Sequence, residues 1–173
     1  RLIDIDNEIL ETLIAEQFKG KPKLIAPNID ALEIGREYSR QNFPSRLKVR
    51  ARKTTNTLGK IMISGNEAAA LGAIYAQATI ASWYPITPST SVAEAFERYA
   101  KRFRMGEDGK LNAAVIQAED ELAAVGMAIG ANWNGARAFT ATSGPGISLM
   151  SEFIGLAYFA EIPLVLFNIQ RGG

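Results

Sequence analysis

The sequence contains neither cysteine nor histidine among its 173 residues. Without cysteine, this chain can form neither a disulfide nor a cysteine-ligated iron–sulfur cluster. Without histidine, it has no histidine metal site and no histidine general base. No stretch approaches the roughly 18 apolar residues of a membrane span, and no signal-peptide pattern opens the sequence. We therefore expect a cytoplasmic protein with no membrane contact.

Basic residues are concentrated in one short stretch that has no aromatic residue within it. The stretch contains Arg46, Lys48, Arg50, Arg52 and Lys53. A cluster of this kind is one mark of nucleic-acid binding. A platform for stacking bases would need aromatic residues among the charges. We therefore interpret the stretch as a solvated linker or as a surface for an acidic partner, and we expect no nucleic acid.

Residues 1–43 show apolar residues at helical spacing and predict two helices. The sequence Gly20-Lys21-Pro22 ends the first helix, Asn28 is the expected N-cap of the second, and Pro44 closes it. Residues 44–59 have the basic and polar composition of a linker. Arg1 is not an initiator methionine and Gly173 follows soon after an apolar run, so we expect a piece of a longer polypeptide.

From residue 60 onward, short apolar runs alternate with helical segments. The predicted strands are 61–63, 80–84, 113–117, 136–141 and 164–169, and the predicted helices are 67–78 (capped by Asn66), 91–104, 119–133 and 147–160. Alternation of this kind predicts an α/β fold with a mostly parallel sheet and helices on both faces, preceded by the short helical segment. Ligands of such folds bind beyond the carboxyl ends of the strands.

Four motifs follow predicted strands. In the first, two prolines bracket Thr87 and stiffen the loop Tyr84–Ser91, although this motif taken alone favours a plain loop that ends in a serine N-cap. In the second, the acids Glu119-Asp120-Glu121 precede a helix rich in alanine and glycine. Acids in a first helical turn complement the helix dipole. The small side chains would also permit close approach by a cofactor or a partner helix.

The other two motifs are suited to polar ligands. Glycines and hydroxyls in Thr140–Gly146 precede a helix N-terminus and favour an anion or polar-ligand site. No Gly-Lys-Ser/Thr follows, so the segment is not a P-loop. Arg171 follows the last predicted strand, where an arginine can hold a carboxylate by two hydrogen bonds or simply meet solvent.

Together these motifs resemble the α subunit of 2-oxoacid:ferredoxin oxidoreductases. The resemblance covers residues 60–173 and rests on Tyr84-Pro85-Ile86-Thr87-Pro88-Ser89, on 117–121, on 139–146 and on Gln170-Arg171-Gly172-Gly173. It implies the N-terminal part of a thiamine-diphosphate pyrimidine-binding domain. It also implies that residues 1–43 are the helical C-terminal tail of a γ-type domain fused ahead of it, with 44–59 as the linker.

The resemblance also implies roles for individual residues. Glu121 would hydrogen-bond the aminopyrimidine of the cofactor, by its spacing to Gly130, with Glu119 as the alternative. Thr87 and Arg171 would bind the substrate. The remaining residues that the resemblance places at the cofactor are Pro85, Ile86, Thr142, Ser143 and Gly144.

The implied reaction is oxidative decarboxylation of a 2-oxoacid with coenzyme A, which yields acyl-CoA, CO2 and reduced ferredoxin. Arg171-Gly172-Gly173 resembles the 2-oxoglutarate branch or the broad 2-oxoacid branch of the family, and 2-oxoglutarate is the favoured substrate. The resemblance implies a hetero-oligomer in which a β subunit holds the diphosphate, Mg²⁺ and an iron–sulfur cluster, so this chain would be inactive alone. Two alternatives stay open: another thiamine-diphosphate 2-oxoacid decarboxylase subunit, and a non-catalytic α/β domain that binds a partner.

Overall fold

The computed structural model describes residues 5–43 and 54–171, and the basic stretch 46–53 lies outside these residues. Contacts divide the chain into two compact units, Arg1–Ile61 and Met62–Gly173. Within the described residues, no helix is both long enough and apolar enough to cross a membrane.

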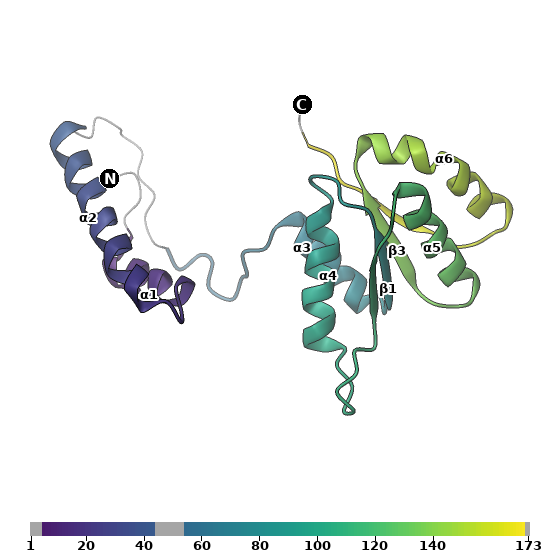
Figure 1. Cartoon of the computed structure of the whole chain (residues 1–173), viewed down its shortest axis with the longest axis horizontal. Coiled ribbons are helices and arrows are strands. Elements are labelled where there is room, and N and C mark those ends of the chain that lie inside the picture. Colours follow the sequence, from purple (N-terminus) through teal and green to yellow (C-terminus); the bar gives the residue numbers. More distant parts are fainter. Residues whose placement is uncertain (1–4, 44–53, 172–173) are drawn as a thin grey trace. The chain divides into compact units, whose positions relative to one another are not determined.

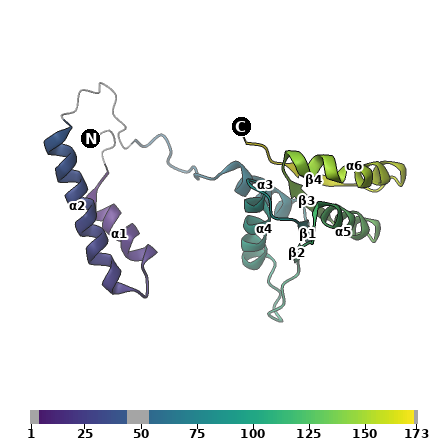
Figure 2. The same cartoon turned by 45° about the horizontal axis from the view of Figure 1, so that its top comes forward.

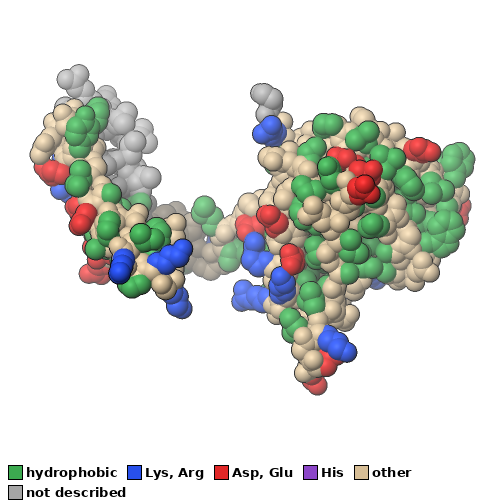
Figure 3. Space-filling view, in the orientation of Figure 1, with side chains coloured by type: hydrophobic (Ala, Val, Ile, Leu, Met, Phe, Trp, Pro, Cys, Tyr) green, Lys and Arg blue, Asp and Glu red, His purple; other side chains and the backbone are tan. Residues whose placement is uncertain are grey.

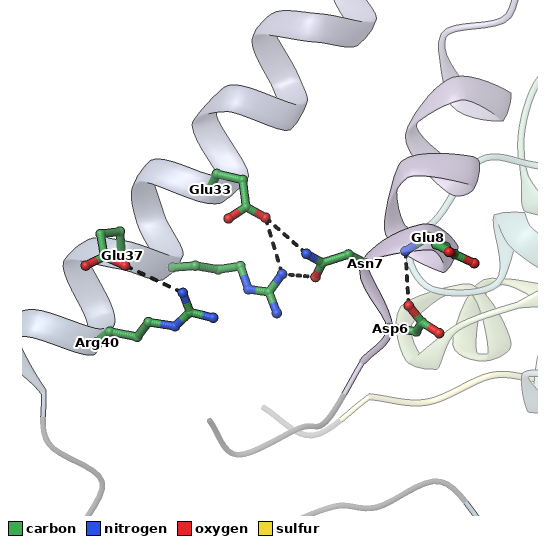
Figure 4. A network of polar contacts seen from close by, with 7 residues as sticks. Asp6, Asn7, Glu8, Glu33, Glu37 and Arg40 are labelled. Carbon is green, nitrogen blue, oxygen red and sulfur yellow. Dashed lines mark hydrogen bonds and ion pairs between the residues drawn. The ribbon is translucent and has the colours of Figure 1, made fainter.

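The first unit is a pair of helices, α1 (Asn7–Gln17) and α2 (Ile25–Asn42), joined through a short 3₁₀ turn, η1 (Pro22–Leu24). Asp6 caps α1 by accepting a hydrogen bond from the Glu8 backbone N–H at 3.2 Å. Polar side chains join the two helices, since Asn7 donates to Glu33 at 3.4 Å (Figure 4). The two predicted helices are therefore confirmed.

The predicted cap of the second helix is wrong. Asn28 lies inside α2, where its side chain donates to the Leu24 carbonyl at 2.7 Å. The physical reason is Pro22, whose fixed φ is already suited to a helical turn, so η1 starts the helical path before Asn28 is reached.

The second unit is an α/β domain, as predicted. Its elements are α3 (Gly65–Tyr75), β1 (Ile80–Trp83), α4 (Thr90–Phe103), β2 (Ala114–Gln117), α5 (Glu121–Trp133), β3 (Ala138–Thr142), α6 (Gly144–Phe159) and β4 (Val165–Asn168). The strands form one sheet in the order β2-β1-β3-β4, and every pairing is parallel. Helices α3 and α4 lie on one side of the sheet, and α5 and α6 lie on the other (Figures 1 and 2).

Each side of the sheet has its own apolar core. On the α3–α4 side, Phe96 meets Phe139 edge to face with ring centroids 4.9 Å apart. On the α5–α6 side, Val125 and Met150 are fully buried. Burial of each such side chain stabilises the fold by about 1.5–3 kcal/mol. The sheet is thus held between two helical layers.

Two predictions at the start of this unit are wrong. Residues 61–63 form no strand, and Ile61 and Met62 are 75% and 105% exposed. Ser64 ends this short run at once, because its hydroxyl accepts from the Glu67 backbone N–H and forms a capping box with Glu67. Ser64, and not Asn66, is therefore the N-cap of α3.

Candidate active site

The loop after β1 is held in place by hydrogen bonds around its prolines. The Ser89 hydroxyl is buried and donates to the Ile86 carbonyl at 2.9 Å. Asn66, at the start of α3, donates to the Pro88 carbonyl at 3.0 Å and to the Ser91 hydroxyl at 2.7 Å. The braced loop leaves Thr87 exposed. Its hydroxyl is therefore open to a ligand at the strand ends.

The three acids after β2 occupy three different environments. Asp120 caps α5, since its carboxylate accepts from the Ala123 backbone N–H at 2.6 Å. Glu119 is exposed. Glu121 is the first residue of α5 and is only 8% exposed. The general preference for acids near a helix N-terminus accounts for Asp120, but it does not explain why a neighbouring carboxylate is buried.

Glu121 is buried because α5 carries it over the neighbouring strand. The chain leaves the edge strand β2 and returns to β3, so α5 passes over β1. This path brings Glu121 next to Thr142 and Gly146. A methyl group on Gly146 would lie 3.1 Å from Glu121 Cγ and would collide with the Thr142 hydroxyl. Gly146 therefore provides the space in which the two side chains meet.

The small residues of α5 make this close packing possible. Ala124 and Ala128 are fully buried against the sheet, and the Ser82 hydroxyl of β1 donates to the Ala124 carbonyl at 2.5 Å. A methyl group on Gly126 would lie 3.4 Å from the Phe153 ring of α6. The bare face predicted for this helix thus packs within the chain itself, against the sheet and α6.

The segment after β3 leads directly into α6. Ser143 is the N-cap position but makes no side-chain cap bond, and Pro145 lies in the first turn. The hydroxyls of Thr140 and Thr142 are buried and have no hydrogen-bond partner among the described residues. Buried polar groups are nearly always paired, and the Thr142 hydroxyl lies in the space that Gly146 opens beside Glu121.

The end of β4 completes the site. The Ile169 backbone N–H donates to the Thr142 carbonyl at 2.9 Å, which extends the pairing of β4 with β3 past the strand end. The Gln170 side chain lies over Gly144, where a methyl group would be 3.3 Å from its Oε1. Arg171 follows and is exposed.

The sheet topology brings the predicted residues to one edge. Because all four strands are parallel, the segments that carry Thr87, Glu121, Ser143 and Arg171 all leave the sheet at its carboxyl edge. The neighbouring strands β1 and β3 continue into α4 and α6, which cover opposite faces (Figure 1). Such a switch point is where open α/β sheets bind ligands. The Tyr84–Ser91 loop and the Ser143–Gly146 segment flank it.

The roles of two residues in the site were not predicted from the sequence. Asn66 was expected to cap a helix and instead holds the Tyr84–Ser91 loop. Gly146 was grouped with the other glycines of its motif, and its role as the contact point of Glu121 and Thr142 depends on how α5 crosses the sheet. A pattern read along the chain gives no sign of such a crossing.

Comparison with known proteins gives consistent results. A family model described as pyruvate flavodoxin/ferredoxin oxidoreductase, thiamine diphosphate-binding, matches residues 71–173. The chain is 37% identical to the 2-oxoacid:ferredoxin oxidoreductase 2 α subunit of Aeropyrum pernix, over 99% of this chain and 28% of that protein. It is 50% identical to the 2-oxoglutarate synthase subunit KorA of Methanocaldococcus jannaschii, over 64% of this chain and 28% of that protein.

A solved structure is similar along almost the whole chain. It is the 2-oxoglutarate:ferredoxin oxidoreductase of Magnetococcus marinus with 2-oxoglutarate, coenzyme A and succinyl-CoA bound. The TM-score is 0.77 at 32% identity, and the match covers 99% of this chain and 29% of that chain. The present chain thus spans less than a third of the length of these relatives.

Proposed function

This chain belongs to the pyruvate flavodoxin/ferredoxin oxidoreductase family, whose thiamine-diphosphate-binding model it matches over residues 71–173, and we propose that it serves as the pyrimidine-binding part of a 2-oxoacid:ferredoxin oxidoreductase α subunit. The observation that carries the proposal is the position of Glu121, a buried carboxylate beside the switch point of the sheet. Among the three adjacent acids, Glu121 alone is withdrawn from solvent.

The residues around Glu121 fit an aminopyrimidine. Such a ring needs apolar surface for its faces and hydrogen-bond partners for its edge. Pro85 and half-buried Ile86 supply apolar surface at the end of β1, and the carboxylate of Glu121 supplies a polar partner, with the Thr142 hydroxyl beside it. We propose that Ser143 and Gly144, at the start of α6, complete the same surface.

Thiamine diphosphate, when bound, supplies an electron sink for decarboxylation. The part of this chain is to hold the ring and to share a proton at the pyrimidine N1′. We assign that proton to Glu121, because a group must lie within hydrogen-bond reach to take part in proton transfer. Positioned acid–base help of this kind is worth about 10²–10⁴ in rate.

We assign substrate binding to Thr87 and Arg171. Thr87 is exposed on a braced loop at the end of β1, and Arg171 is exposed just past β4, at the same edge of the sheet. A guanidinium binds a carboxylate with paired, charge-assisted hydrogen bonds, and a hydroxyl can donate to a neighbouring carbonyl oxygen. The pair thus suits a substrate that has a carboxylate next to a keto group.

The proposed reaction joins a 2-oxoacid to coenzyme A, releases CO2 and passes the two electrons to ferredoxin. We favour 2-oxoglutarate, the 2-oxoacid in the name of the M. jannaschii relative and bound in the M. marinus enzyme. We propose that a β subunit holds the diphosphate, Mg²⁺ and the cluster, because this chain has no cysteine to ligate one. The cytoplasmic location stays a prediction.

The surface of the second unit supports a hetero-oligomer. Large apolar side chains stay exposed on α5 and α6, among them Trp133, Tyr158 and Phe159. Hydrophobic side chains gather over this part of the unit in Figure 3. Apolar patches of this kind mark interaction surfaces. For residues 1–43 we propose the tail of a γ-type domain, since the A. pernix α subunit matches 99% of this chain.

The experiment combines the chain with its partner. The purified chain, a purified β subunit of a 2-oxoacid:ferredoxin oxidoreductase and the mixture of the two are each supplied with 2-oxoglutarate, coenzyme A, thiamine diphosphate and oxidised methyl viologen. We expect viologen reduction by the mixture and none by this chain alone. Release of CO2 without viologen reduction would indicate a simple decarboxylase. Failure of the mixture to bind thiamine diphosphate would favour a non-catalytic binding domain.

A further inference from the structure

The Thr142 hydroxyl is buried at a place where it costs the free chain stability. Its side chain is 1% exposed, and its oxygen has no hydrogen-bond partner among the described residues. Valine has the same shape and would leave no donor unpaired. Replacing an unpaired buried hydroxyl by an apolar group of equal size is neutral or stabilising. The hydroxyl is therefore not explained by packing.

The geometry around Gly146 indicates what the hydroxyl serves. Phe139 and Ala141 of β3 belong to the core on the α3–α4 side. Side chains alternate along a strand, so Thr140 and Thr142 face the other side, toward α5 and α6. Thr142 and Glu121 are neighbours, because both border the space above the bare Cα of Gly146. Glu121 is itself buried, so a carboxylate in this position gains from any donor that can reach it.

We propose that Thr142 is a positioning residue for Glu121: its hydroxyl donates a hydrogen bond to the Glu121 carboxyl and holds it toward the pyrimidine N1′. The missing side chain of Gly146 leaves open the space between the hydroxyl and the Glu121 side chain. Thr142 therefore acts through Glu121 and does not contact the reacting atoms. This inference rests on the function proposed above.

Thr140 provides a matched control. It is a threonine of the same strand on the same face, it is fully buried, and its hydroxyl is also unpaired among the described residues. Its atoms are not among the three nearest to the space above Gly146, where Thr142 and Glu121 meet. Thr140→Val therefore removes an equivalent hydroxyl with an equivalent change in shape, but it leaves the proposed contact intact.

The test compares stability with cofactor chemistry. In this chain, we expect Thr142→Val and Thr140→Val to leave the melting temperature unchanged or to raise it by about 2–4 °C. In the enzyme assembled with its β subunit, exchange of the C2 proton of bound thiamine diphosphate is followed by NMR. We expect Thr142→Val to slow exchange about tenfold, with Thr142→Ser close to wild type and Thr140→Val unchanged. A change in cofactor affinity of less than threefold should accompany the loss.

A double mutant separates this proposal from the proposed function. If Thr142 acts through Glu121, adding Thr142→Val to Glu121→Gln should slow exchange by less than twofold beyond Glu121→Gln alone. Normal exchange in Thr142→Val, while Glu121→Gln is slow, would overturn the role of Thr142 and leave that of Glu121 in place. Equal losses in the two valine variants, or no recovery in Thr142→Ser, would also overturn it. Normal exchange in Glu121→Gln would refute the proposed function of Glu121 itself.

Discussion

Gly146→Ala should destabilise the second unit, because the added methyl group has no space. It would collide with the Thr142 hydroxyl and lie 3.1 Å from both Thr142 Cβ and Glu121 Cγ. Thr142 Cβ is fixed by the backbone of β3, and the buried side chains of Thr142 and Glu121 have little room to turn aside. Overpacking of this kind typically costs about 1–3 kcal/mol.

Gly155→Ala in the same helix is the control. No atom lies within 4 Å of a methyl group at Gly155, and the residue is inside α6. Alanine is favoured over glycine in a helix interior by up to about 1 kcal/mol. The two substitutions make the same chemical change in one helix and should therefore shift stability in opposite directions.

Urea unfolding followed by tryptophan fluorescence measures both effects. Both tryptophans, Trp83 and Trp133, lie in the second unit, so the signal reports on that unit. The free energy of unfolding should fall in Gly146→Ala and rise or stay level in Gly155→Ala, at an unchanged slope with urea. Adding Thr142→Ala should recover part of the loss in Gly146→Ala, because it removes the colliding hydroxyl. A Gly146→Ala chain as stable as the wild type would refute the close contact.

Three further predictions concern other residues. In the assembled enzyme, Arg171→Ala should lower kcat/KM for the 2-oxoacid at least tenfold, because loss of one partner of a charged pair costs on the order of 2–5 kcal/mol. Thr87→Ala should lower kcat/KM more weakly, and both variants should bind the cofactor with nearly unchanged affinity. Unchanged kinetics in both variants would refute the assignment of these residues to substrate binding. Asp120→Ala should lower the free energy of unfolding by about 0.5–2 kcal/mol through loss of the α5 cap, and an unchanged urea midpoint would contradict that. The Ser64 hydroxyl donates a hydrogen bond to the Glu67 carboxylate and lowers the pKa of that carboxyl from its usual 4.5, so the stability that this hydrogen bond adds is present above pH 4.5 and is lost as the pH falls below 4.5. Glu67→Gln should therefore weaken the dependence of the melting temperature on acid pH. A dependence identical to that of the wild type would contradict the assignment.

The fold could be predicted because its signals are local and repeated. The apolar runs at 80–84, 113–117 and 164–169 each contain a strand of the sheet, and the segments between them form helices. The errors in predicted helix and strand bounds occur where neighbouring residues favour different local structures. The segment Gly144-Pro145-Gly146 looks like a loop, yet α6 already begins at Gly144, because proline is well suited to a first helical turn.

The site could be predicted only in part, for a physical reason. Sequence places Thr87, Glu121 and Arg171 after strands, and a parallel sheet then brings those strand ends to one edge. Sequence does not give the order β2-β1-β3-β4, which sends α5 over β1 and places Glu121 beside Thr142. Contacts of this kind depend on how helices cross the sheet, and a single sequence carries no signal for that.

The central claim is that Glu121 holds the proton at the pyrimidine N1′. The direct test is the rate of C2 proton exchange of thiamine diphosphate bound to the assembled enzyme, measured in Glu121→Gln, Glu119→Gln and Asp120→Asn. We predict that Glu121→Gln keeps its fold and slows exchange about a hundredfold or more. Glu119→Gln, at an exposed position, and Asp120→Asn, at the helix cap, should exchange at nearly the wild-type rate. Slow exchange in Glu119→Gln with normal exchange in Glu121→Gln would contradict the claim and move the proton to Glu119.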